Sequence, residues 1–182
     1  MKKLAVVTVT WILFAFGTGS AHAEAKNGFG LNGGVATHHM TDPIFGNYQS
    51  TGLSIGLDYQ FAVSENFSIN PFLMSSGEST SGAVLSGTIA GHGILGLQLR
   101  YWIGDMFIGG HLASYSEALS NTTGNTTIST SAHGGGAGLV AGWENPNGGM
   151  FVMGQLDSAK LQYTGSTTKL SGFRLSIGYR WK

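Results

Sequence analysis

Gly172-Phe-Arg-Leu-Ser-Ile-Gly-Tyr-Arg-Trp181 alternates large apolar residues with small or polar ones over its whole length. Alternation with period two is typical of a β-strand with one apolar face and one polar face. Three earlier segments show the same pattern, at residues 52–61, 95–101 and 138–144. All four segments end in large aromatic side chains. These endings recur about every 40 residues, the length of one strand-loop-strand-turn unit in membrane barrels.

The connections between the predicted strands alternate in length. Short segments containing Asn, Asp, Gly or Pro follow the aromatic endings, and such residues close tight hairpins. These segments are 62–66, 103–105 and 145–148. Longer polar segments lie between the hairpins, at 38–49, 75–86, 116–132 and 158–168. Short turns on one side and long external loops on the other are typical of outer-membrane barrels.

The intervening strands are predicted near Gly28–Thr37, Phe67–Met74, Met106–Tyr115 and Met150–Asp157. Together with the four alternating segments they predict an all-β fold, an eight-stranded antiparallel up-and-down transmembrane β-barrel. Strands of about ten residues are long enough to cross a bilayer. Pro71 lacks a ladder donor and weakens the pattern of its strand. The sequence leaves open whether His111 or Leu112 faces inward, because both alternations there are mixed.

The composition and the amino-terminal segment fit an exported protein. Two lysines after the first residue, an apolar run to Phe16 and the ending Ala21-His22-Ala23 are the three parts of a secretory signal peptide. We expect residues 1–23 to be the signal peptide and residues 24–182 the barrel. Cysteine is absent, which excludes disulfides and thiolate metal sites. There is no basic stripe, so a nucleic-acid partner is not expected.

The whole predicted mature chain resembles the small outer-membrane barrel superfamily that includes OmpX and the transmembrane domain of OmpA. The similar features are Phe61-x5-Phe67 around the first tight turn and the final segment from Phe173 to Trp181. That ending resembles the carboxyl-terminal signal read by the barrel-assembly machinery, although here Lys182 follows the terminal aromatic.

The resemblance implies a bacterial outer-membrane location with both termini in the periplasm. The implied partners are outer-membrane lipids, lipopolysaccharide, the barrel-assembly machinery and a possible host or cell-surface ligand at the loops. The implied role is in envelope integrity or in adhesion-type surface interaction. No cofactor is implied.

Alternation also assigns side chains to the two faces of the predicted barrel. Charged and polar residues of the small-residue face are expected to fill the lumen and to neutralise one another, because an unpaired buried charge is costly. This lumen set is Asp58, His92, Arg100, Glu144, Asp157, Arg174 and Arg180. The aromatic endings are expected to form a girdle at the headgroup layer. The girdle set is Tyr59, Phe61, Tyr101, Trp102, Trp143, Tyr179 and Trp181.

Other functions stay open beside the non-enzymatic role in envelope integrity or adhesion. Ser129, Ser131 and His133 lead into the sixth predicted strand, where residues two apart would share a face, and Glu117 is available as an orienting acid. Such a group could catalyse acyl transfer, which would make the chain a lipid A deacylase. The His-x-Ser-Asn order of those enzymes is absent, so no catalytic residue is assigned. A narrow channel and a soluble secreted barrel are the remaining alternatives.

The first polar segment contains residues that could suggest a surface metal site. His38 and His39 are adjacent, with Asp42 close by. Neighbouring residues of an extended backbone point in opposite directions, so the two imidazoles are not expected to hold one ion. The sequence therefore predicts no metal site.

Overall fold

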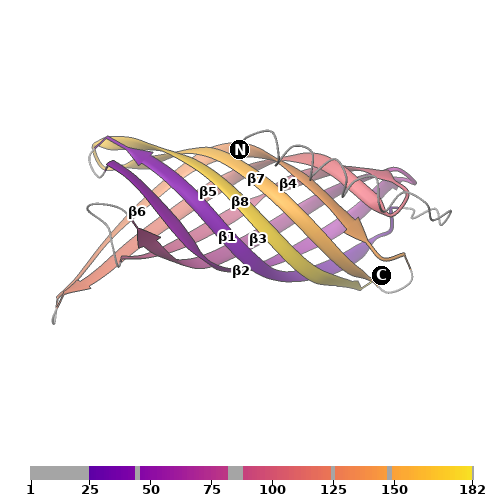
Figure 1. Ribbon diagram of the computed structural model, residues 1–182. Helices are drawn as coiled ribbons and strands as arrows, with labels where there is room; N and C mark the ends of the chain where they lie inside the picture. Colours follow the sequence, from indigo (N-terminus) through magenta and orange to yellow (C-terminus); the bar gives the residue numbers. More distant parts are fainter. Residues whose placement is uncertain (1–24, 44–45, 82–87, 124–125, 147–148, 182) are drawn as a thin grey trace, which may run out of the picture.

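The structure is a computed structural model that describes residues 25–43, 46–81, 88–123, 126–146 and 149–181. The predicted signal peptide lies outside these residues. The described chain folds into β-strands that follow one another as hairpins (Figure 1). Their bounds are β1 Gly28–Asp42, β2 Gly46–Ser64, β3 Phe67–Ser81, β4 Ile89–Ile103, β5 Met106–Thr123, β6 Thr126–Glu144, β7 Met150–Tyr163 and β8 Ser166–Trp181. Across the ranges given above, no helix is long and apolar enough to cross a membrane.

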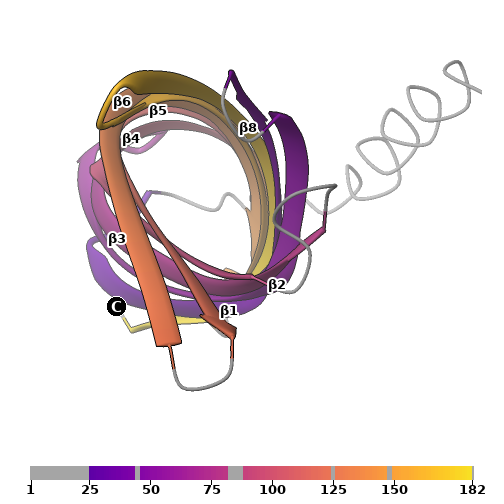
Figure 2. The same ribbon diagram turned by 90° about the vertical axis from the view of Figure 1, so that its left-hand side faces the viewer.

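The eight strands close into one antiparallel barrel in which each strand pairs with its sequence neighbours. The ring closes where β1 pairs with β8, from Phe29 opposite Trp181 to Thr41 opposite Lys169. Figure 2 shows the barrel from one end. Closure removes the exposed strand edges on which unpaired backbone groups would otherwise lie. The prediction of an eight-stranded up-and-down barrel is confirmed.

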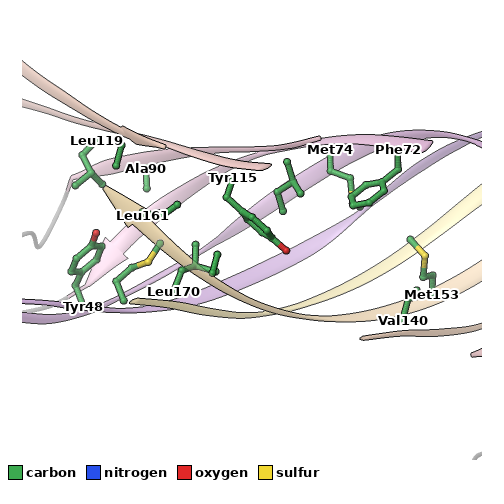
Figure 3. Packing of buried hydrophobic residues seen from close by; sticks show 14 of the residues in the cluster. Tyr48, Phe72, Met74, Ala90, Tyr115, Leu119, Val140, Met153, Leu161 and Leu170 are labelled. Atoms are coloured by element: carbon green, nitrogen blue, oxygen red, sulfur yellow. The ribbon is translucent and has the colours of Figure 1, made fainter. Parts of the chain in front are cut away.

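Alternation along each strand sends side chains in turn to the outside and to the inside. On β2, Leu53 is 73% exposed, whereas its neighbour Ser54 is 7% exposed. The interior contains apolar side chains, among them Phe72, Met74 and Tyr115, which are seen from close by in Figure 3. Polar and charged side chains occupy the remaining inward positions. The core of the molecule is therefore the filled bore of the barrel.

The strands extend further than the sequence predicts at the end opposite the tight turns. Strand β1 continues to Asp42 and β5 to Thr123, beyond the expected ends at Thr37 and Tyr115. The polar segments expected to be long loops are thus largely strand. The expectation was wrong because the outward side chains of these extensions are polar, so hydrophobicity stops alternating although the backbone still does. Their inward side chains remain apolar in part, as at Met40.

The tight turn between β4 and β5 requires glycine, because Gly104 has a φ of +58° there, a conformation that glycine adopts without steric cost. The structure also shows which way the fifth strand faces. On β5, His111 is 4% exposed and Leu112 is 71% exposed. The histidine therefore faces the bore, which resolves the orientation that the sequence left open.

Candidate functional site

Inward-facing charged side chains form three groups along the barrel. The turn-end group (Asp58, Arg100, Glu144 and Arg180) lies nearest the tight turns. In it, Arg180 Nη2 is 2.9 Å from Asp58 Oδ2 and Arg180 Nε is 3.0 Å from Glu144 Oε2. Arg100 Nη2 lies 3.4 Å from the same Asp58 oxygen. Each of these side chains is buried, so the group is a compact, mutually neutralising network.

Neighbouring side chains hold the two arginines of the turn-end group in place. Arg100 donates to Gln98 Oε1 from Nε at 3.0 Å and from Nη2 at 2.6 Å. The Arg100 guanidinium also lies 4.6 Å from the centre of the Phe107 ring, and that of Arg180 lies 5.2 Å from the Phe151 ring. Cation–π contacts of this kind stabilise a desolvated cation. The network is therefore fixed by both polar and aromatic contacts.

The middle group (His111, Tyr115, Asp157 and Arg174) surrounds one carboxylate. Tyr115 donates its hydroxyl to Asp157 Oδ1 at 2.9 Å, and His111 Nε2 lies 3.0 Å from that oxygen. Arg174 Nη1 contacts the sulfur of Met74 at 3.0 Å. Its Nε and Nη2 make no hydrogen bond to any described residue.

The mouth group (His38, Glu78, His92 and Glu117) occupies the barrel end with the extended strands. His38 Nδ1 lies 2.8 Å from Glu78 Oε1. His92 Nε2 lies 3.7 Å from Glu78 Oε2 and 3.8 Å from Glu117 Oε1. The rings of His38 and His92 stack with their centres 4.4 Å apart. Two imidazoles and two carboxylates therefore converge on one point of the bore.

Burial and mutual contact set the protonation of the mouth group. Burial raises the pKa of Glu78, but the hydrogen bond with His38 and the neighbouring charge of His92 outweigh burial and hold the pKa at about 2. Burial, together with the charge of His38, lowers the pKa of His92 to about 4. At neutral pH the Glu78 carboxylate is therefore ionised and the His92 ring is neutral. The His92 charge that lowers the pKa of Glu78 is present only below about pH 4.

On the outer face, a cationic patch lies over β7 and β8 beside the end of β1. Lys160 of β7 is the direct cross-strand partner of Lys169 of β8. Both are exposed, and both line a groove together with His39 and Thr41. We refer to Lys160, Lys169 and His39 as the lysine patch. Like charges placed directly opposite each other on a sheet repel, so an anion bound between them would stabilise the pair.

No protein-family model matches the chain, and no curated protein matches its sequence. Solved structures match its fold. Ail, the attachment invasion locus protein of Yersinia pestis, matches with a TM-score of 0.59 and 15% identity, over 86% of this chain and 99% of that one. Neisserial surface protein A matches with a TM-score of 0.63 and 8% identity, over 84% of this chain and 97% of that one. Both are small eight-stranded outer-membrane barrels. The chain has their fold.

A further match shows a member of this fold with a ligand. Ail in complex with the heparin analogue sucrose octasulfate matches with a TM-score of 0.55 and 15% identity, over 86% of this chain and 99% of that one. At this identity the small outer-membrane barrel fold is shared, whereas function does not follow from fold alone.

The structure places the expected lumen residues as a set inside the barrel. Asp58, His92, Arg100, Glu144, Asp157, Arg174 and Arg180 are each between 0% and 5% exposed. They fall into the three groups described above rather than into one network.

The expected girdle residues divide between the two faces. Tyr59, Phe61, Tyr101, Tyr179 and Trp181 are exposed on the outside and Trp143 is half-buried. Trp102 is the exception, because it is 2% exposed and its indole N–H donates to Ser68 Oγ at 3.2 Å. Its assignment to the girdle was wrong, since Trp102 shares the inward alternation of Arg100.

The residues weighed for acyl transfer do not come together. Ser129, Ser131 and His133 are exposed on the outside of β6. Glu117 is 1% exposed inside the barrel, where Tyr48 and Tyr163 donate to it. The barrel wall therefore separates the acid from the histidine that it would have to orient.

Glu78 of the mouth group and two tyrosines that contact Glu117 were missed from the sequence. Glu78 and the tyrosines at positions 48 and 163 all lie in segments that were expected to be loops. Extending the alternation of β3 two residues past Ser76 would have placed Glu78 inward. Inward and outward positions still alternate in this part of β3, but the outward residues are no longer apolar, so the alternation cannot be recognised from hydrophobicity.

Proposed function

We propose that this chain is an integral bacterial outer-membrane barrel that acts without catalysis, by interaction at the cell surface. The observation that carries the proposal is the lysine patch, which lies just beyond an apolar outer belt. The fold shared with Ail and with Neisserial surface protein A supports the membrane location. The names of these two proteins refer to attachment and to the surface.

The apolar belt has the height that a bilayer requires. On β2 the outward side chains are apolar from Leu53 to Phe61 and polar from Thr51 to Asn47. A membrane-spanning strand needs about 9–11 residues, and the segment from Leu53 to Phe61 supplies nine of them. The polar extensions then project beyond the membrane, and the tight turns and termini face the periplasm. We assign the surface role to this extended polar wall rather than to long loops.

The position of the lysine patch suits the anionic groups of lipopolysaccharide. Lys160 lies four residues beyond Leu156, the last large apolar residue on the outside of β7. At about 3.3 Å per residue and a strand tilt of about 40°, this places the backbone of Lys160 about 10 Å above that of Leu156. Phosphate groups of the outer leaflet lie at that level, and a pair of facing lysines matches their charge. A sulfated sugar is the competing anion, because Ail has been solved in complex with the heparin analogue sucrose octasulfate.

Replacing both Lys160 and Lys169 with alanine is expected to weaken lipopolysaccharide binding about 30-fold, because each cation near an anionic surface contributes about 1 kcal/mol. Titration of the detergent-solubilised barrel with purified lipopolysaccharide measures the change. Lys26→Ala, an exposed lysine just before β1, is the matched control and is expected to bind normally. Unchanged affinity in the double variant, or a loss confined to sucrose octasulfate, would remove the lipopolysaccharide assignment.

Placing a charge in the middle of the belt tests the membrane location separately. Leu57→Arg is expected to lower the free energy of unfolding in liposomes by about 2–4 kcal/mol, because arginine is costly at the bilayer midplane. Gln49→Arg is on the same face of the same strand but beyond the belt, and it is expected to change stability little. Denaturant titration of both variants in lipid gives the answer. Equal effects at the two positions would contradict the assigned boundary.

A further inference from the structure

We propose that the mouth group is a binding site for one divalent transition-metal ion of the Zn²⁺ type, with His38, Glu78 and His92 as ligands and Glu117 as a fourth. This departs from the sequence-based expectation, which considered His38 together with His39 and Asp42. In the structure His39 is exposed on the outside, whereas His38 is 0% exposed inside the barrel.

Four different strands bring these ligands together. His38 comes from β1, Glu78 from β3, His92 from β4 and Glu117 from β5. His92 and Glu117 are direct cross-strand partners, and Ser76, two residues before Glu78, is the partner of His92 on β3. The inward alternation of paired strands therefore places the carboxylates around the imidazole. This arrangement belongs to the framework of the barrel rather than to a loop.

The distances between the donor atoms suit a small ion. One ligand atom from each of His38, Glu78 and His92 lies within 4.8 Å of the others. A tetrahedral ion with bonds of about 2.0 Å has its ligand atoms about 3.3 Å apart. His92 Nε2 lies at 3.7 Å and 3.8 Å from its two nearest carboxylate oxygens, so small side-chain rotations close the coordination sphere.

Both imidazoles have buried nitrogens without partners, which is the second observation for a ligand. His92 Nδ1, His92 Nε2 and His38 Nε2 make no hydrogen bond to the described part of the chain. The two histidines are at most 3% exposed. Buried polar atoms normally have a hydrogen-bond partner, and a metal ion would accept the lone pair of a neutral imidazole nitrogen. The two carboxylates would balance the charge of a divalent ion.

The surroundings of the group resemble the outer shell of a metal site. Ser50 and Ser76 donate their hydroxyls to Glu78, and Tyr48 donates to Glu117. Hydrogen bonds to ligating carboxylates orient them and tune their basicity. Further toward the mouth, Leu119 follows Glu117 on the inward face of β5, and Figure 3 shows it at the same end of the barrel as Tyr48 and other apolar side chains. An ion bound below these side chains would be shielded from water.

The donor set selects the class of ion. Imidazole nitrogens with carboxylate oxygens suit Zn²⁺, Co²⁺, Ni²⁺ and Cu²⁺, whereas Mg²⁺ and Ca²⁺ prefer oxygen ligands alone. We therefore expect one Zn²⁺ per chain and no competition from a large excess of Ca²⁺ or Mg²⁺.

The test is a Zn²⁺ titration of the chelator-treated full barrel in detergent, followed by calorimetry and by the absorption spectrum of the Co²⁺ form. The expected result is one site per chain and a nitrogen-ligated Co²⁺ spectrum. Combining His38→Ala with His92→Ala is expected to weaken Zn²⁺ binding at least about 100-fold, and Ser50→Ala about 10-fold or more. His39→Ala, a neighbouring histidine on the outside, is the matched control and is expected to bind normally.

The folded state of each variant is checked by its resistance to unboiled SDS, so a folding defect is separated from loss of the site. If the double variant does not fold, Glu78→Gln retains the size of the side chain, removes its charge and is expected to weaken binding by a similar factor. The proposal is overturned if the wild-type barrel binds no Zn²⁺, or if binding is lost in His39→Ala. Retention of the full wild-type affinity in a folded His38 and His92 double variant, or in Glu78→Gln, overturns it equally.

Discussion

Asp58→Ala is expected to lower the free energy of unfolding by about 3–5 kcal/mol, because removing one partner of a buried ion pair leaves the other charge uncompensated. Asp58 Oδ2 is 2.9 Å from Arg180 and 3.4 Å from Arg100. Its loss leaves Arg100 with no carboxylate within ion-pair distance among the described residues, while Arg180 retains Glu144. The bore offers little water to replace the lost partner, since both guanidinium groups are buried.

Denaturant titration of the refolded barrel in liposomes measures this effect. Glu65→Ala is the control, because Glu65 is an exposed carboxylate in the turn between β2 and β3 and is expected to change stability by less than about 0.5 kcal/mol. Asp58→Asn is expected to lower the free energy of unfolding by an amount between those of Asp58→Ala and Glu65→Ala, since it keeps the shape of the side chain and one acceptor oxygen. A loss below about 1 kcal/mol in Asp58→Ala would show that the turn-end group does not depend on this carboxylate.

Gly34→Ala is expected to impair barrel closure and to lower the free energy of unfolding by about 3 kcal/mol or more. This is at or above the upper end of the range measured when a packed core is overfilled. A Cβ at Gly34 would lie 2.0 Å from the carbonyl oxygen of Leu175 and 2.8 Å from the Cα of Ser176. These atoms belong to the backbone of β8, so they cannot move away without disrupting the β1–β8 ladder that closes the ring.

Mobility on a denaturing gel before and after boiling measures closure, because a closed barrel resists unboiled SDS. Gly77→Ala is the matched control on the outside of β3, where an added Cβ meets nothing within 4 Å. It is expected to leave closure intact and to stabilise the strand by about 0.5–1 kcal/mol, the difference between alanine and glycine in a regular strand. Wild-type gel behaviour of Gly34→Ala would contradict the steric argument.

Local alternation in the sequence predicts the strands of the barrel and their inward and outward faces, but it does not predict how far the strands extend beyond the apolar belt. Residues 172–181 alternate large apolar with small or polar side chains, and the structure places Phe173 outside and Arg174 inside as that pattern requires. Beyond the belt, the outward positions of β1 are Thr37, His39 and Thr41. These side chains face water, so selection for hydrophobicity ends there while strand pairing continues. Because the outward positions there are no longer apolar, the strand extensions could not be recognised from the sequence, and neither could the inward position of Glu78.

Where large apolar and small or polar residues alternate clearly, as at residues 172–181, the sequence by itself determined which face of the barrel wall each side chain lies on, because successive residues of any strand point to opposite sides. It could not determine which inward side chains meet across the bore. His38, Glu78 and His92 converge only after the ring has closed, since strand tilt and stagger set the relative heights of strands that are not neighbours. Those heights belong to the closed barrel as a whole, and no local segment encodes them.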